Sequence, residues 1–271
     1  MVARGYLLAW RLARFLPEPW AQWLFARIAD VLCWRNGEGV RRLRANLEAI
    51  GPVDDALLRQ ATRSYLRYWC EAFRLPAWPI GDLVSRTRVE NEALVRREFG
   101  SGGAVLALPH MANWDWAGAW ATATGMPVVS VAERLEPETI YERFVTYRRS
   151  IGIEILPLDG PHTIAELLRA LRHGRLICLL CDRDIAGTGV EVELLGRRAR
   201  MAQGPAVLAQ RTGAALLPVT ARYEGHELVL TVHERVEPAD PATMMQSVAD
   251  VFSQAIRHSP QDWHMMQRVF L

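Results

Sequence analysis

From Gly103 onward, short apolar segments alternate with amphipathic stretches of helical length, and this rhythm is the feature that most constrains the fold. Strands are predicted over residues 104–108, 128–132, 154–158, 176–181, 216–223 and 228–235. Helices are predicted over 114–124, 136–150, 163–173, 205–212 and 241–258. Strands that alternate with helices in this way predict an α/β fold, with a central, mostly parallel sheet flanked by helices.

The first 80 residues follow a different pattern and predict four amphipathic helices, over about 5–15, 18–35, 37–50 and 54–74. With 271 residues, half of them hydrophobic, the chain can bury one large core. We therefore predict a single domain over 1–271, in which a helical portion (1–80) precedes an α/β core (81–271).

The first two predicted helices combine tryptophan with arginine. Both side chains suit the headgroup layer of a membrane, where an amphipathic ring and a long cation are each satisfied. Packing on the α/β core explains the same pattern, and the two interpretations can hold on different faces. No run of 18 uncharged apolar residues and no signal-peptide pattern occurs, so we expect peripheral membrane contact and no membrane span. The residues concerned are Trp10, Trp20, Trp23 and Trp34, with Arg11, Arg14, Arg27 and Arg35.

Charge and cysteine content argue against several classes of protein. The 32 basic and 30 acidic residues leave a formal net charge of +2, which disfavours a nucleic-acid partner. Four scattered cysteines fit a reducing compartment better than a disulfide framework, and Cys178 and Cys181 read as core residues of a buried strand. Because no carboxylate–histidine set has metal-ligand spacing, we expect no metal.

His110 is the strongest candidate for a catalytic residue. It follows the predicted strand 104–108, and ligands of open α/β sheets bind at the carboxyl ends of strands. Imidazole is a suitable base for a hydroxyl near neutral pH, and a carboxylate on its other ring nitrogen would fix the tautomer. Asp115 can reach His110 only from the first turn of the next helix, whereas Asp182 ends a strand at the same sheet edge. We prefer Asp182 as the orienting carboxylate and treat Asp115 as structural or auxiliary.

An ordered series of motifs extends over nearly the whole chain. It resembles the bacterial lipid acyltransferases that include the late lipid A acyltransferases, and it looks most like the phosphatidylinositol mannoside acyltransferases of actinobacteria. The motifs are Arg67-Tyr68-Trp69, Arg74-Leu75-Pro76, His110-x-x-x-x-Asp115-Trp116-Ala117-Gly118, Val131-Ala132-Glu133-Arg134-Leu135, Tyr147-Arg148, Cys181-Asp182-Arg183-Asp184, Gly189-Val190, Gly204-Pro205-Ala206, Pro218-Val219 and Pro260-x-Asp262-Trp263-His264-Met265.

This resemblance implies an enzyme that transfers a palmitoyl-type group from acyl-CoA to a mannose hydroxyl of a phosphatidylinositol mannoside. It implies a peripheral protein at the cytoplasmic face of the plasma membrane, with no permanently bound cofactor. His110 matches the family's base. Asp182 matches an acidic partner that is glutamate in close relatives, and the shorter side chain requires a small adjustment for contact. Arg148 matches a basic residue of the site, suited to a phosphate or to the thioester carbonyl.

Other candidate residues have two interpretations each. Gly204 and Pro205 open a helix whose free N–H groups could bind a donor phosphate, although a simple helix start explains them as well. Glu133 and Arg134 could line the acceptor pocket or form a surface ion pair. Arg183, beside Asp182 in the matched motif, is expected to contact substrate.

The resemblance and the site leave alternatives within and outside acyl transfer. The acceptor could be another glycolipid of the late lipid A type, and the same histidine could instead activate water in an acyl-CoA thioesterase. A catalytically silent lipid-binding protein would need a defective site. No GxSxG motif and no catalytic cysteine pattern occurs, so direct attack by the acceptor is expected and an acyl-enzyme is not.

Overall fold

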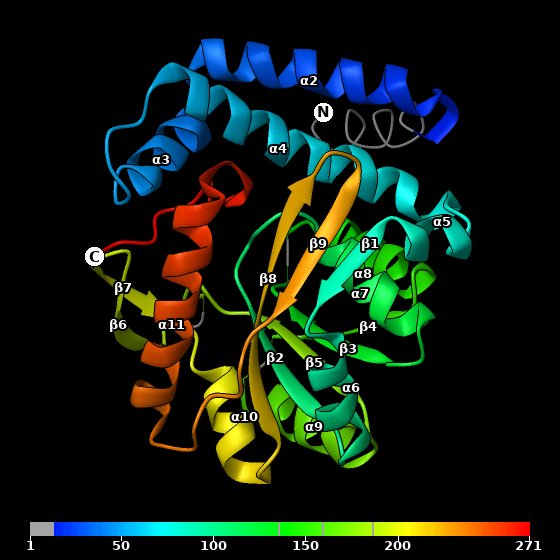
Figure 1. The fold of residues 1–271 in the computed structure, drawn as a ribbon, viewed down its shortest axis with the longest axis vertical. Helices are drawn as coiled ribbons and strands as arrows, with labels where there is room; N and C mark the ends of the chain where they lie inside the picture. Colours follow the sequence, from blue (N-terminus) through cyan, green and yellow to red (C-terminus); the bar gives the residue numbers. More distant parts are fainter. Residues whose placement is uncertain (1–13, 135, 159, 186) are drawn as a thin grey trace.

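A computed structural model describes residues 14–134, 136–158, 160–185 and 187–271. Its centre is a seven-stranded sheet with the order β1-β9-β8-β2-β5-β3-β4 (Figure 1). Neighbouring strands are parallel except for the β8–β9 pair, which is antiparallel. The strands are β1 (Thr87–Glu90), β2 (Ala104–Leu108), β3 (Val128–Ala132), β4 (Ile153–Pro157), β5 (Leu176–Leu180), β8 (Ala215–Glu224) and β9 (Glu227–Val232).

Helices cover both faces of this sheet, so the predicted α/β class is confirmed. Alternate residues of a strand point to opposite faces, and β2 shows this directly. Val105 and Ala107 pack with α9, α10 and α11, whereas Leu106 and Leu108 pack with α6 and α7. The helices of this part are α5 (Ile80–Ser85), α6 (Glu92–Gly100), α7 (Trp114–Ala123), α8 (Glu138–Ser150), α9 (Gly160–Arg172), α10 (Gly204–Thr212) and α11 (Pro241–His258), followed by the 3₁₀ turn η2 (Pro260–Asp262).

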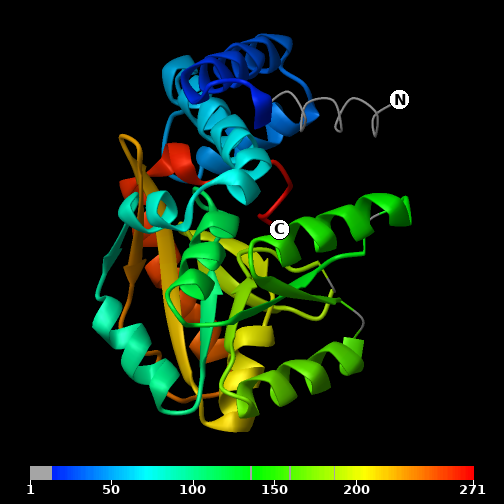
Figure 2. The same ribbon diagram turned by 90° about the vertical axis from the view of Figure 1, so that its right-hand side faces the viewer.

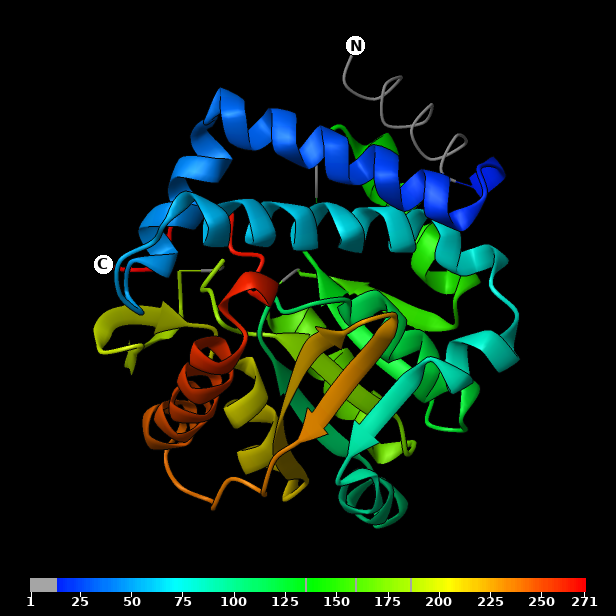
Figure 3. The same ribbon diagram turned by 45° about the horizontal axis from the view of Figure 1, so that its top comes forward.

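The N-terminal helices α2 (Glu18–Arg35), α3 (Glu38–Leu47) and α4 (Asp55–Arg74) form a separate layer at one end of the sheet (Figure 2). Figure 3 shows α4 crossing above the strands, with α2 running along its outer side. Ala21, Phe25 and Ala29 of α2 are buried against the α4 side chains Cys70 and Phe73. Helix α2 is thus packed on α4, within the helical layer, and not directly on the α/β core as one interpretation of its sequence expected.

The outer face of α2 remains open to solvent. Trp20, Trp23 and Trp34 are 65%, 58% and 82% exposed, although tryptophan is ordinarily well buried. No helix of the described residues is both long and apolar enough to cross a membrane. The predicted helix over about 5–15 lies almost entirely outside the described residues.

Several elements differ from the prediction. Strand β1 and helices α5 and α6 were not predicted, because this stretch is short, polar and lacks a clear period. A second, two-stranded sheet formed by β6 (Val190–Leu194) and β7 (Arg197–Met201) was also missed. It follows Asp182 in the chain, so it lies next to a residue that the sequence predicts to be catalytic.

Candidate active site

The sheet topology places His110 beside Asp182. Strands β2 and β5 are parallel neighbours, with Leu108 opposite Leu180. Beyond their ends the backbone N–H of Cys181 donates to the carbonyl of Leu108 at 2.9 Å. The two chains therefore leave the sheet side by side, and their next residues emerge at the same edge.

His110 and Asp182 form a tightly bonded pair. The His110 ring nitrogen Nδ1 lies 2.6 Å from Asp182 Oδ1, and the backbone N–H of His110 donates to Oδ2 at 2.9 Å. The aspartate is fully buried, whereas a quarter of the histidine side chain is exposed. The shorter carboxylate thus reaches the ring directly, and the ring presents its other nitrogen, Nε2, to the exposed side.

The environment of Asp182 favours a carboxylate anion. Burial alone would raise its pKa, but the charge of His110 and the hydrogen bonds from His110 and Trp263 outweigh burial and lower it. An ionised Asp182 can only accept hydrogen bonds, so Nδ1 of His110 carries a proton and Nε2 is the basic atom. This is the tautomer that a general base requires.

Asp115 lies in the first turn of α7, where its carboxylate is bonded to Arg148 and Tyr68. Its Oδ1 accepts from Nε of Arg148 at 2.8 Å, and its Oδ2 accepts from the hydroxyl of Tyr68 at 3.0 Å. Burial opposes the charge of Arg148 and is the largest single influence, but Asp115, Tyr68 and Tyr147 together outweigh it and raise the pKa of the guanidinium. Of the two aspartates considered, Asp182 therefore contacts the histidine and Asp115 holds the arginine.

A segment near the C-terminus closes over the histidine loop. The backbone N–H of His264 donates to the carbonyl of His110 at 2.7 Å, and that of Ala112 donates to the carbonyl of Asp262 at 2.8 Å. Between them, the indole Nε1 of Trp263 donates to Asp182 Oδ2 at 2.9 Å. Sequence reasoning used this segment only as part of the motif series, and no role was predicted for its residues.

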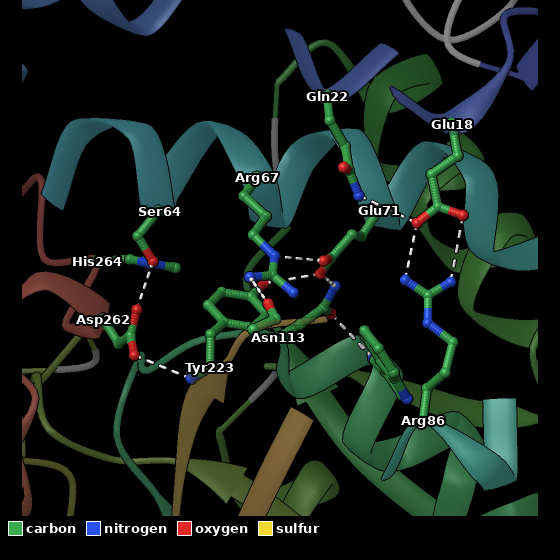
Figure 4. Close-up of polar contacts among 12 residues, drawn as sticks. Glu18, Gln22, Ser64, Arg67, Glu71, Arg86, Asn113, Tyr223, Asp262 and His264 are labelled. Carbon is green, nitrogen blue, oxygen red and sulfur yellow. Dashed lines mark hydrogen bonds and ion pairs between the residues drawn. The ribbon is translucent and has the colours of Figure 1, made fainter. Parts of the chain in front are cut away.

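Figure 4 shows the buried polar contacts that join this segment to α4. Ser64 donates to Asp262 at 2.6 Å and lies 2.9 Å from Nε2 of His264. Asp262 also accepts from the backbone N–H of Tyr223 at 2.9 Å. Spacing in the sequence gave no sign of the contact between Ser64 and His264, because its members are 200 residues apart.

A neighbouring part of the same network fixes the start of α7. Glu71 of α4 accepts from Arg67, from the hydroxyl of Tyr223 and from the amide of Asn113. The side-chain oxygen of Asn113 in turn caps α7 by accepting from the N–H of Trp116 at 2.9 Å. The loop from His110 to α7 is thus held at both ends by buried hydrogen bonds.

An apolar cavity lies between α7 and the sheet. Its free internal space is about 70 Å³. Its walls include Leu106, Cys178 and Ala121, and Trp114 and Arg148 also line it. The Trp114 ring meets the His110 ring edge-on, with ring centres 5.3 Å apart, so the cavity lies close to the histidine.

The remaining candidates take up different positions. Arg183 lies 3.7 Å from Glu133, which joins the residues after β5 and β3 at the same sheet edge. Arg134 pairs with Glu138 on an exposed surface, so its partner is not the neighbouring Glu133. Helix α10 begins at Gly204 with Pro205 in its first turn, shortly after Ala202 donates to the carbonyl of Cys181.

Comparison with known proteins identifies the family of the chain. The model of the bacterial lipid A biosynthesis acyltransferase family matches residues 3–271. The chain belongs to this family. It is an acyltransferase, as the sequence predicts, and its motif series reflects true membership.

Two relatives can be aligned with almost the whole length of this acyltransferase. A phosphatidylinositol mannoside acyltransferase of Mycolicibacterium smegmatis is 42% identical over 273 residues, which are 97% of this chain and 89% of that protein. A protein of the same name from Mycobacterium tuberculosis is 39% identical over 279 residues, 98% of this chain and 88% of that protein.

Proposed function

We propose that this acyltransferase transfers a long-chain fatty acyl group from acyl-CoA to a mannose hydroxyl of a phosphatidylinositol mannoside. The observation that carries the proposal is the His110–Asp182 pair, which leaves a basic Nε2 at the carboxyl end of the sheet. The names of the two relatives, each about 40% identical over nearly the full chain, support the acceptor.

The chemistry follows from the pair. His110 Nε2 takes the proton of the acceptor hydroxyl as its oxygen attacks the thioester carbonyl. The carbon–sulfur bond then breaks, and the leaving thiolate takes the proton back from the imidazolium that Asp182 stabilises. A base of this kind contributes about 10² to 10⁴ in rate. No acyl-enzyme is formed in this scheme.

Other parts of the molecule suit the two substrates. The apolar cavity beneath α7 suits the part of the acyl chain next to the thioester, which would lie near Trp114 and His110. Arg148 and Arg183 are the cations available for the thioester carbonyl or for phosphate. The N-terminus of α10, at Gly204 and Pro205, offers N–H groups to a donor phosphate.

The exposed face of α2 suits a membrane surface. Its tryptophans lie beside Arg27 and Arg35, the combination that favours the headgroup layer. We place the enzyme at the cytoplasmic face of the plasma membrane, where a lipid acceptor and a soluble acyl-CoA meet.

The test is a transfer assay with labelled palmitoyl-CoA and a panel of mannosylated and glucosaminyl lipids in liposomes. His110→Ala should lose at least about 10²-fold in transfer while keeping the fold, because the base is removed. The matched control is His173→Ala, an exposed histidine just after α9, which should transfer at the wild-type rate. Near wild-type transfer by His110→Ala would overturn the proposal.

The same assay separates transfer from hydrolysis. Free fatty acid that does not decrease when the mannosylated lipid is added would indicate a thioesterase. Transfer to glucosaminyl lipids in preference to mannosylated ones would replace the proposed acceptor.

A further inference from the structure

We infer that Trp263 is a positioning residue for the reaction, because its indole N–H fixes and partly neutralises the carboxylate that orients His110. The inference rests on the proposed function, in which His110 is the base. It concerns a residue that contacts neither the histidine ring nor the cavity.

The three hydrogen bonds of Asp182 are unevenly divided. Oδ2 accepts two, from the backbone N–H of His110 and from Nε1 of Trp263, both at 2.9 Å. Oδ1 accepts one, from the ring of His110 at 2.6 Å. Two donors on one oxygen lock the rotation of the carboxylate, so the other oxygen points at Nδ1.

The Trp263 bond is strong because its surroundings are dry. Trp263 and Asp182 are each fully buried, so no bulk water competes for the carboxylate. Hydrogen bonds to charged groups are worth more than those between neutral groups, especially where the local dielectric constant is low. The indole therefore withdraws part of the negative charge that Asp182 would otherwise direct at the imidazolium.

The fold holds Trp263 in place independently of this bond. Met111 and Trp263 form an isolated antiparallel bridge, flanked by the two backbone bonds between the histidine loop and residues 262–264. The ring of Trp263 also packs edge-on against Phe270. The donor thus remains where it is when the substrate binds.

Other titratable groups surround His110, among them Asp262, whose pKa is raised by burial. Burial, with a smaller effect of His110, lowers the pKa of His264 to about 3, so this ring is neutral. Burial and the charge of Asp182 raise the pKa of the Cys181 thiol, which is neutral too. The charged pairs on the neighbouring elements are Asp115 with Arg148, behind Trp114, and Glu133 with Arg183.

Removing the indole donor should change both the rate and its pH dependence. The carboxylate becomes free to rotate, so kcat/KM at its pH optimum should fall about tenfold, the effect of one hydrogen bond to a charged group. The charge on Asp182 is less neutralised, so the imidazolium is favoured. The acidic limb of the pH profile should therefore move up by about 0.5 to 1 pH unit.

The experiment compares two tryptophans that differ in their acceptor. Trp263→Phe removes the donor to Asp182, and Trp116→Phe removes an equally buried donor that bonds to Thr87 at 2.8 Å. Only Trp263→Phe should move the acidic limb, whereas both should lose stability. In an Asp182→Asn background, Trp263→Phe should lower kcat/KM no further, because the carboxylate that it positions is absent.

A shape-conserving substitution covers the case in which phenylalanine disturbs folding. Replacing Trp263 by β-(3-benzothienyl)alanine exchanges the N–H for sulfur and keeps the bicyclic ring, so the same shift is expected. An unchanged limb in this variant, or an equal shift in Trp116→Phe, would overturn the inference.

An NMR titration of His110 in the same proteins separates this inference from the proposed function. The titration midpoint of the imidazole should move to higher pH in the Trp263 variants and stay constant in Trp116→Phe. A shifted midpoint in a protein that transfers no acyl group would refute the function and keep the positioning role. A constant midpoint in an enzyme that transfers acyl groups would refute the positioning role and keep the function.

Discussion

Asp182 and Asp115 are both buried beside the loop that carries His110, yet their partners give them different roles. Asp182 is bonded to a histidine that is partly exposed, together with two N–H donors. Asp115 is bonded to Arg148 and Tyr68. The carboxylate of Asp182 thus holds the proton on Nδ1 of His110, and the carboxylate of Asp115 neutralises the guanidinium of Arg148. Position near the active site does not by itself decide what a carboxylate does.

The largest effect should come from Asp182→Asn. The donors His110 N–H and Trp263 Nε1 both require an oxygen at the Oδ2 position, so the new amide nitrogen must face the histidine ring. It donates to Nδ1, which forces the proton onto Nε2 and removes the base. We expect kcat to fall on the order of 10³- to 10⁴-fold.

The fold should tolerate this change, because the asparagine keeps the volume of the aspartate. The measurement is kcat for acyl transfer, with urea unfolding in parallel. If Asp182→Asn keeps more than a tenth of the wild-type kcat, Asp182 does not orient the base, and the two aspartates do not differ in function.

Asp115→Asn should affect mainly stability. It leaves the guanidinium of Arg148 buried without its counter-charge, and breaking a buried pair in this way costs about 3–5 kcal/mol. Urea unfolding should show a loss near the lower figure, since 16% of the arginine side chain is exposed. An unfolding free energy equal to that of the wild type would show that the two aspartates are not distinguished by their partners.

The smallest effect concerns pH. Burial lowers the pKa of His264 to about 3, so the unfolded chain binds a proton below pH 6.5 that the folded protein does not. Stability is therefore complete above pH 6.5 and decreases as the pH falls toward 3. From this group we expect a loss on the order of 2 kcal/mol between pH 7 and pH 5.

His264→Gln should flatten that part of the stability curve, as measured by urea unfolding at pH 7 and pH 5. Asp115→Asn serves as the comparison, because it should lower stability at both pH values without changing the slope. Equal slopes in His264→Gln and the wild type would exclude His264 as the source of the acid sensitivity.

Local patterns in the sequence predicted most of the central fold. The buried strands β2, β3 and β5 are apolar runs bounded by helices. Because β2 and β5 were expected to end at the same sheet edge, the sequence also predicted that His110 lies beside Asp182. The hairpin β6–β7 has the alternation of a half-buried strand, since the buried Val192 and Leu194 alternate with the exposed Glu191 and Glu193. By contrast, β1 is a polar edge strand of four residues without a comparable pattern.

The surroundings of the dyad were harder to predict than the dyad itself. Trp263 reaches Asp182 from 81 residues away, and Ser64 reaches His264 from 200 residues away. Such contacts depend on how the C-terminal segment folds back, which neither periodicity nor motif spacing encodes. The resemblance marked residues 262–264 as part of a pattern, but only the geometry explains what they do.

The bridge between the histidine loop and residues 262–264 has a consequence for how the enzyme matures. All strands of the central sheet are synthesised before this segment leaves the ribosome. Contacts between such distant parts of a chain carry a high loop-closure cost and form late. A nascent chain therefore has a sheet, and even a histidine at its edge, before it has an organised base. Organisation of the His110–Asp182 pair therefore requires residues 262–264 to fold back onto the histidine loop.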